Sequence, residues 1–253
     1  EAGRSAELLR VAARRAAGFF RPSKRNEVVW VEGENELAVM FAEVEKCGGV
    51  VTDVVGDSMR AIWAMSQPDS QTRARACAGA LAVAAAVERF NAQPGRPQLP
   101  TRIGLHSGTI RLGTIGGAGH LEFRAVGDIV NTASRIEGLN KQLGTRILVS
   151  GDTLAETDGL RTSELGTFLL AGKSTPLVIH ELLDSEAQGG VRVSDRHARF
   201  ATALAAFRAS RWQAAAEIFA DLHREQPDDG PSRFYTDLCA SYLANGPDSF
   251  ESG

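Results

Sequence analysis

Two groups of polar residues in this sequence have the types and spacing needed for chemistry on phosphates. Asp57 follows Gly56 between two apolar runs, and a hairpin turn there would hold its carboxylate away from the sheet, within reach of a divalent cation. Asn131 and Arg135 are four residues apart in a predicted helix, so they share one face. An arginine fork presents several fixed donors to phosphate oxygens.

Each of these residues also has an ordinary structural interpretation. Aspartate is common in hairpin turns, so Asp57 taken alone indicates no more than a turn. Arg135 would also suit a solvated helix face, where it would pair with Glu137 or Asp128. The surrounding segments decide between these interpretations.

The hydrophobic pattern predicts the elements that must position these side chains. Val54 and Val55 lead into the turn at Gly56, and Gly108 is taken as part of a second turn. Helices are predicted over 1–20, 35–46, 70–92, 126–143, 195–224 and 231–244. Strands are predicted over 28–31, 50–52, 59–63 and 146–150, with hairpins 101–105/109–115 (around His106-Ser107-Gly108) and 167–170/178–182.

This mixed order of strands and helices predicts an α+β fold, an α/β sandwich. We expect a ferredoxin-like mixed sheet with helices packed on one face, followed by a small C-terminal helical pair. The predicted units are an N-terminal linker helix over 1–26, a main domain over 27–184 and a helical tail over 191–253. The tail resembles half of a tetratricopeptide repeat. One repeat cannot bury its own face, so a helical pair packed on the main domain is the favoured interpretation.

Composition excludes several classes of function. The chain has 253 residues, 43% hydrophobic and 23% charged, as in ordinary globular proteins. A net charge of −3 argues against a nucleic-acid partner. Three widely spaced cysteines indicate neither a disulfide framework nor a zinc site. No apolar run reaches the roughly 18 to 20 residues that cross a bilayer, so we expect a cytoplasmic chain without membrane contact of its own, compatible with an upstream membrane sensor.

Four segments in this order resemble the class III purine nucleotide cyclases, which make cyclic AMP or cyclic GMP. The resemblance covers roughly residues 28–184. The segments are 48–57 (GGVVTDVVGD), 102–108 (RIGLHSG), 126–135 (VGDIVNTASR) and 170–177 (LAGKSTPL).

The resemblance implies a reaction and roles for individual residues. The ribose 3′-hydroxyl of a purine nucleoside triphosphate would attack the α-phosphate, and pyrophosphate would leave. Asn131 would steer the ribose, and Arg135 would bind the α-phosphate in the transition state. Lys173 would meet the terminal phosphates, although an exposed turn lysine explains it equally well. The family builds each site across two subunits, so a homodimer is implied.

The resemblance also implies two metal ions, Mg²⁺ or Mn²⁺, held by two acidic residues. Asp57 matches one of them. The family's first metal aspartate ends a strand that precedes a Gly-Phe-Thr turn, and this sequence lacks that stretch. Its nearest analogue is the 28–31 run ending at Glu32, which is one methylene longer than aspartate. Glu32 is therefore a candidate metal ligand, with a surface-loop glutamate as the alternative.

The positions that read the base also depart from the family. Family members that use ATP resemble one another in a lysine at the position of Asp53 and an aspartate or threonine at that of Arg124. In this sequence the acidic residue stands at the first of these positions and the basic residue at the second. Guanine offers donors at N1 and N2 and an acceptor at O6, which Asp53 and Arg124 complement. We therefore expect GTP to be slightly favoured over ATP, with an Asp53–Arg124 salt bridge in a disused pocket as the alternative.

Three functions remain open from the sequence. The first is an enzyme, a purine nucleotide cyclase in signalling that is active as a homodimer. The second is a catalytically dead cyclase-homology domain that serves as a regulatory or dimerisation module. The third, a helical-repeat interaction module, rests on residues 195–244 alone.

Overall fold

The computed structural model gives the fold of most of the chain. No described helix is long and apolar enough to cross a membrane. The described residues are 4–13, 36–55, 58–65, 69–95, 98–117, 120–184 and 190–246. The strands are β1 (Arg4–Ala13), β2 (Val50–Val55), β3 (Ser58–Met65), β4 (Thr101–Gly117), β5 (His120–Val126), β6 (Ile147–Ser150), β7 (Thr162–Phe168) and β8 (Leu177–Leu182). The helices are α1 (Glu36–Lys46), α2 (Ser70–Asn91), α3 (Asp128–Leu143), α4 (Gly151–Leu154), α5 (Gly190–Arg208), α6 (Trp212–Glu225) and α7 (Gly230–Asn245).

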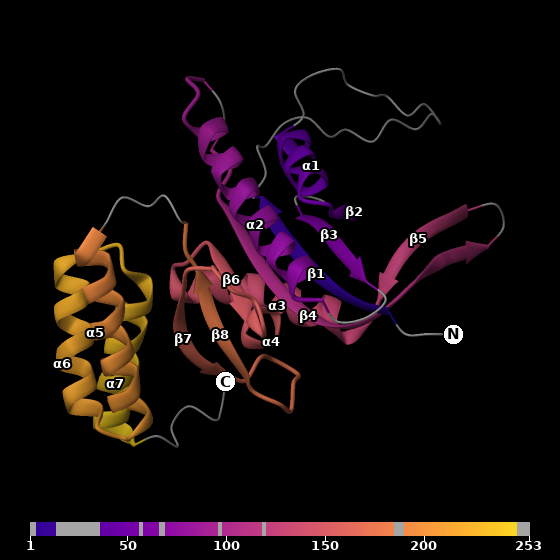
Figure 1. Ribbon diagram of the computed structural model, residues 1–253. Coiled ribbons are helices and arrows are strands. Elements are labelled where there is room, and N and C mark those ends of the chain that lie inside the picture. The colour runs from indigo at the N-terminus through magenta and orange to yellow at the C-terminus, as the bar shows by residue number, and fades with distance from the viewer. Residues whose placement is uncertain are drawn as a thin grey trace.

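The described strands form one mixed sheet in the order β2-β3-β1-β4-β6-β8-β7 (Figure 1). The β4–β6 pair is parallel and the other pairs are antiparallel. β5 pairs with the far half of β4, and these two strands extend as an arm from the body. The predicted α+β class, with a ferredoxin-like mixed sheet, is confirmed.

The N-terminal residues correct one prediction. Residues 4–13 form β1, hydrogen-bonded between β3 and β4 in the middle of the sheet, whereas the sequence predicted a linker helix over 1–26. The apolar residues of this short run are Leu8, Leu9 and Val11, and their spacing suits either a helical stripe or a strand. Pairing with two distant strands overrides the local preference. β1 therefore belongs to the sheet of the main domain.

The second predicted hairpin is also wrong. His106 and Ser107 lie inside β4, which runs without a turn from Thr101 to Gly117. The turn comes later, between β4 and β5, where Gly117 pairs with His120. On the side of β1 the 106–108 segment finds ladder partners, because His106, Ser107 and Gly108 pair with Leu8, Glu7 and Ala6. A strand that is paired along its length keeps going through residues that would otherwise favour a turn.

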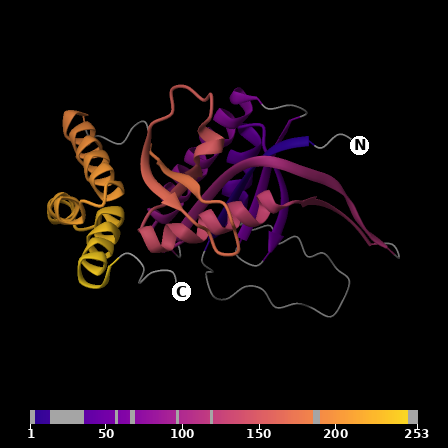
Figure 2. The same cartoon turned by 90° about the horizontal axis from the view of Figure 1, so that it is seen from below.

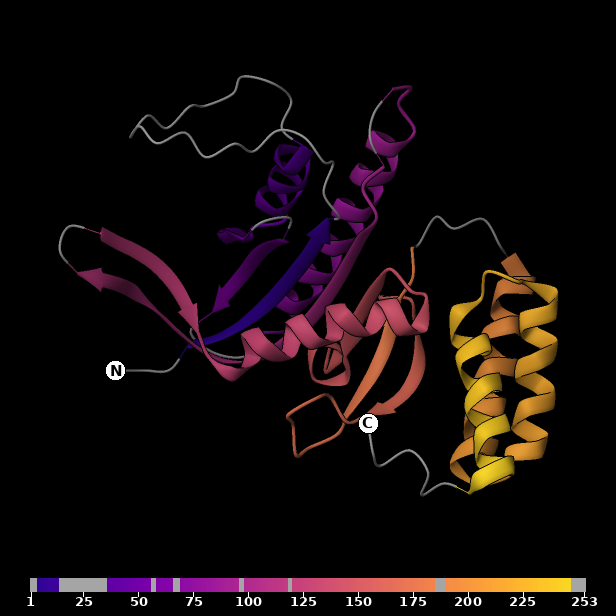
Figure 3. The same cartoon turned by 180° about the vertical axis from the view of Figure 1, so that it is seen from behind.

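Helices cover both faces of the sheet, not one face as predicted. On β3, Trp63 packs with α1 and α2, while the adjacent Ile62 packs with α3 on the other face (Figure 3). This alternation follows from the two-residue period of a strand. α3 crosses β4 at Gly104, where an added Cβ would lie 2.3 Å from the backbone nitrogen of Glu137. Close backbone packing at Gly104 thus fixes α3 on the sheet.

The described part of the tail, residues 190–246, consists of three helices, α5 to α7, where a pair was predicted. The predicted helix over 195–224 is interrupted at Ser210, which has a φ of 57°, and α6 starts at Trp212. The three helices stand together beside β7 at one end of the molecule (Figure 2). Tyr235 on α7 fastens them to the sheet, because its hydroxyl donates a 2.6 Å hydrogen bond to the Leu165 carbonyl of β7.

Candidate functional site

The first half of α3 presents the predicted catalytic residues on its outer face. Asn131 is exposed and Arg135, one turn later, is partly buried. Thr132, Ala133 and Ile136 are fully buried on the opposite side of the helix. The apolar stripe of α3 therefore packs on the sheet and directs Asn131 and Arg135 outward, as the four-residue spacing predicted.

Arg135 lies against the turn that joins β7 to β8. Gly172 in this turn has a φ of 67°, and a Cβ added to it would lie 3.2 Å from a terminal guanidinium nitrogen of Arg135. Among the described residues no acceptor takes a hydrogen bond from Arg135, and the predicted alternative ion pairs with Glu137 or Asp128 are not formed. Its fork of donors is thus available for an anionic ligand.

Lys173 comes from the same turn and pairs with Asp128 at the start of α3. The lysine side chain is 17% exposed and the aspartate 70%. A hydrogen bond from Lys173, assisted by the charge of Arg135, holds the pKa of Asp128 below its ordinary value. The structure thus brings Asn131, Arg135 and Lys173 to one surface, together with the exposed carboxylate of Asp128.

A hydrogen-bond network beneath this surface was missed from the sequence. The His106 Nδ1 and the Ser150 Oγ lie 2.8 Å apart, and Ser150 in turn contacts the Thr153 hydroxyl at 3.1 Å. The Ser107 hydroxyl donates to Thr153 at 3.0 Å. Burial lowers the pKa of His106, so its imidazole is neutral at pH 7. The only sequence signal was the 102–108 segment, which had been interpreted as a turn.

Asp53 has a partner that the sequence did not suggest. Arg60 on β3 donates to the Asp53 carboxylate on β2 at 3.1 Å, and each side chain is 24% exposed. Arg124, the predicted partner of Asp53, has its side chain outside the described residues. Its backbone pairs with Gly113 in the β4–β5 arm, and β5 approaches β2. The pair found at the predicted base-reading position is therefore Asp53–Arg60.

The predicted metal ligands Asp57 and Glu32 lie outside the described residues. Val55 and Ser58, which flank the 56–57 turn, pair with each other as the ends of a hairpin. Beside them, β1 places Ala12 opposite Ser58. The described part of β1 ends at Ala13, so Ala12 and Ala13 are the residues of β1 beside this end of the hairpin. Within the described parts of the chain no group of three or more His, Cys, Asp or Glu residues could hold a metal ion.

Comparison with known proteins gives one family match and several relatives. The family model of the adenylate and guanylate cyclase catalytic domain matches residues 32–182. Adenylate cyclase 1 of Rhizobium meliloti is 39% identical over 154 residues, which cover 59% of this chain and 23% of that protein. The chain thus spans about a quarter of the length of this relative. These comparisons give no support to the alternative of a catalytically dead domain.

Solved structures show the same fold. The adenylyl cyclase CyaB from P. aeruginosa matches with a TM-score of 0.57 and 22% identity, covering 74% of this chain and 97% of that one. The guanylate cyclase domain of RhGC from Catenaria anguillulae, solved in complex with GTP, matches with a TM-score of 0.54 and 21% identity, covering 71% and 96%. Adenylyl and guanylyl cyclases both share the fold, so the fold does not select the base.

Proposed function

Because the chain belongs to the adenylate and guanylate cyclase catalytic domain family, we propose that it converts a purine nucleoside triphosphate into a 3′,5′-cyclic nucleotide and pyrophosphate. The observation that carries the proposal is the surface formed by α3 and the β7–β8 turn. There Arg135 has no acceptor among the described residues, and it stands beside Lys173 and Asn131. Such a surface suits a triphosphate.

The reaction forms one bond and breaks one. The ribose 3′-oxygen attacks the α-phosphorus and loses its proton to solvent, while the bond from the α-phosphorus to the bridging oxygen of pyrophosphate breaks. Asn131 orients the ribose with its amide. Arg135 donates to the α-phosphate oxygens as their negative charge grows, which stabilises the transition state. Lys173 exchanges Asp128 for the terminal phosphates when the nucleotide binds.

Divalent metal ions are typical of this family, and Mg²⁺ or Mn²⁺ would neutralise phosphate charge and activate the 3′-hydroxyl when bound. We assign Asp57 as one ligand because it matches one of the family's two metal-binding acidic residues and closely follows Val55, the last residue of β2. Neither Ala12 nor Ala13, at the described end of β1 near Ser58, carries a carboxylate, so we look to another part of the chain for the second ligand. Glu32 is our candidate for that second ligand.

We assign guanine as the preferred base. Asp53 is partly exposed on β2 and is held in place by Arg60. A carboxylate accepts from the N1 and N2 donors of guanine, while a neighbouring guanidinium donates to O6. Arg60, or Arg124 from the approaching β5, would supply that donor. Adenine presents an acceptor at N1, which a carboxylate would repel.

The domain would act as a homodimer in the cytoplasm, where nucleoside triphosphates are available. The edge strand β2 supports dimer formation, since it exposes Val50 and Val54 at 59% and 42%. A second chain would cover these valines and bring the Asp57 turn of one protomer to the Arg135 surface of the other.

The purified chain, incubated with Mn²⁺ and either GTP or ATP, should release a cyclic nucleotide detectable by mass spectrometry. An Asp57→Ala variant run in parallel should lose the product, which excludes a contaminating cyclase. A folded wild-type protein that yields no product from either nucleotide would contradict the proposal.

A mixing experiment tests whether two chains share each site. Asp57→Ala and Arg135→Ala should each be inactive alone. Random pairing makes half of the dimers mixed, each with one intact site of two, so an equal mixture should recover about a quarter of wild-type activity. No recovery after exchange of subunits would show that each site lies within one chain.

A further inference from the structure

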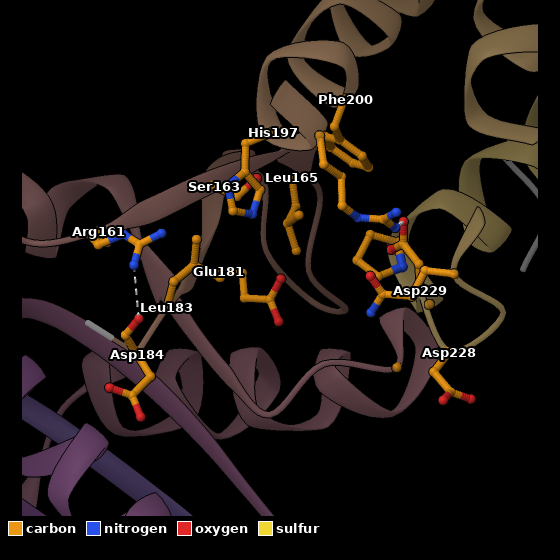
Figure 4. Close-up of a pocket in the computed structure, with 15 residues that line it drawn as sticks. Arg161, Ser163, Leu165, Glu181, Leu183, Asp184, His197, Phe200, Asp228 and Asp229 are labelled. Atoms are coloured by element: carbon orange, nitrogen blue, oxygen red, sulfur yellow. Dashed lines mark hydrogen bonds and ion pairs between the residues drawn. The ribbon is translucent and has the colours of Figure 1, made fainter. Parts of the chain in front are cut away.

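A cavity of about 300 Å³ lies between the β7–β8 hairpin and the helical tail (Figure 4). Ser163, Leu165 and Glu181 come from the hairpin, and Phe200 comes from α5. Gly144, just after α3, also lines it. Nine residues of helix rise place this end of α3 about 13 Å from Arg135, so the cavity is separate from the proposed nucleotide site.

Closely packed backbone fixes the walls of this cavity. Gly230 at the start of α7 abuts the end of α3, where an added Cβ would lie 2.1 Å from the Leu143 carbonyl oxygen. On the other side of the cavity, the Tyr235 hydroxyl donates a hydrogen bond to the Leu165 carbonyl. The cavity therefore lies between elements that are held together by direct contacts, and a ligand would find it already formed.

The basic residues of the cavity are already engaged by the protein. Arg161 donates to the Asp184 backbone carbonyl at 3.4 Å. Arg196 pairs with Asp229 and donates to the Leu222 carbonyl at 3.1 Å. These guanidinium groups are thus committed to the walls of the cavity.

Two acidic residues of the cavity, in contrast, have no such partner in the described part of the chain. In Figure 4 the Glu181 carboxylate points into the open space between the hairpin and the tail. In the described part of the chain it has no hydrogen-bond or ion-pair partner, and the same holds for Asp228 at the rim. The last carbonyl groups of α3, near Gly144, add the negative end of a helix dipole. The cavity therefore combines unpaired negative charge with the apolar side chains of Leu165 and Phe200.

We propose that this cavity binds a small organic cation, a protonated primary amine on an apolar carbon frame. The ammonium group would meet the Glu181 carboxylate, and the frame would lie against Leu165 and Phe200. Neither the family match nor the proposed cyclase reaction assigns a ligand to this place.

The protonation of Glu181 gives the site a pH dependence. Burial raises the pKa of Glu181 to about 7, and burial lowers the pKa of His197 across the cavity, so that imidazole is neutral at pH 7. A bound cation favours the ionised carboxylate, so affinity should rise as the pH passes upward through 7. The charged or titratable groups that face Glu181 from the surrounding elements are Arg161, Asp184, Arg196, His197, Asp228 and Asp229.

Benzylamine is a suitable probe, because it is small enough for the cavity and stays protonated from pH 5.5 to 8. Titrated into the ¹⁵N-labelled chain at pH 8, it should shift amide signals of residues that line the cavity. Glu181→Gln, which keeps the side-chain shape, should weaken binding at least ~10-fold. Glu217→Gln, an exposed change on α6 outside the cavity, should leave it unchanged. Benzyl alcohol, the neutral analogue, should bind at least ~10-fold more weakly than the amine.

Equal affinity for amine and alcohol, or wild-type affinity in Glu181→Gln, would overturn the proposal. A circular dichroism spectrum confirms that the variant is folded. If it is not, the wild-type protein still decides the question. Its affinity for benzylamine should fall more than ~10-fold from pH 8 to 5.5 as Glu181 takes up a proton. An unchanged affinity across this range would contradict the assignment.

Discussion

Arg60 on β3 donates a 3.1 Å hydrogen bond to the carboxylate of Asp53 on β2, at the position where the proposed enzyme reads its base. The two residues face each other because β2 shifts register between Val51 and Asp53. Such a bulge turns a side chain toward a new neighbour. The carboxylate is thus held in place before any nucleotide binds, and it can accept from guanine but not from the N1 of adenine.

Replacing Asp53 should therefore change the choice of base. Asp53→Ala is expected to lower kcat/KM for GTP by about 10- to 100-fold, because the donors of guanine lose their acceptor. The value for ATP should change less than about 3-fold. Steady-state assays with both nucleotides measure the ratio of kcat/KM for GTP to kcat/KM for ATP. An unchanged GTP/ATP ratio would contradict the assignment of Asp53 to base recognition.

Lys173 should contribute to binding of the phosphates rather than to the chemical step. Lys173→Met removes the charge and keeps most of the chain length, so KM for the nucleotide should rise about 10-fold while kcat falls less than about 3-fold. Initial rates over a range of nucleotide concentrations separate the two parameters. Lys141→Met, an exposed lysine in the last turn of α3, serves as the matched control. A selective loss of kcat in Lys173→Met would instead place the lysine in the transition state.

Docking of the tail should depend on the close contact at Gly230. Gly230→Ala would place a methyl group 2.1 Å from the Leu143 carbonyl oxygen, so it should lower the free energy of unfolding by more than about 2 kcal/mol. Gly138→Ala is a matched change in α3, where an added Cβ meets nothing within 4 Å. The Gly138→Ala change should raise the free energy of unfolding by roughly 0.5 to 1 kcal/mol. Urea unfolding of both variants tests the contrast, and equal effects would mean that the two helices do not meet as described.

The local parts of this fold could be predicted from the sequence, and the long-range parts could not. The helix that carries Asn131 and Arg135 follows from the spacing of apolar residues within one element. The β2–β3 hairpin is likewise signalled by Gly56 between a β-branched run and the apolar run 59–63. β1 was mistaken for a helix because its strand character comes from partners about 50 and 100 residues away, at Met59 and Ile103.

In the candidate site, too, the local features could be predicted from the sequence and the long-range ones could not. The roles of Asn131 and Arg135 were proposed from motifs, and the structure places both on the outer face of α3. The Asp53–Arg60 pair was not predictable, because a one-residue bulge decides which side chains face each other and the local sequence does not reveal it. Glu181 looked like an ordinary strand residue. Its environment depends on the tail, which is distant in sequence and packs over it only in the folded chain.

Glu181 should also make stability depend on pH. Burial raises its pKa from 4.5 to about 7, so between these values the folded protein holds a proton that the unfolded chain has released. The contribution of Glu181 to stability is therefore fully present below pH 4.5 and is lost as the pH rises through 7. Relative to Glu181→Gln, the wild-type free energy of unfolding should fall by up to about 3 kcal/mol from pH 4.5 to 8. Parallel urea titrations measure this difference, and a constant difference would show that Glu181 is solvated.

The most direct test of the cyclase assignment is the rate of cyclic nucleotide formation after Arg135→Lys. Lysine keeps the charge but loses the fork of donors, so kcat should fall about 10²- to 10³-fold with little change in KM. Arg233→Lys, an exposed residue on α7, should match the wild-type rate. This result would place Arg135 on the α-phosphate in the transition state. A wild-type kcat in folded Arg135→Lys would contradict the account and remove the α3 surface from the reaction.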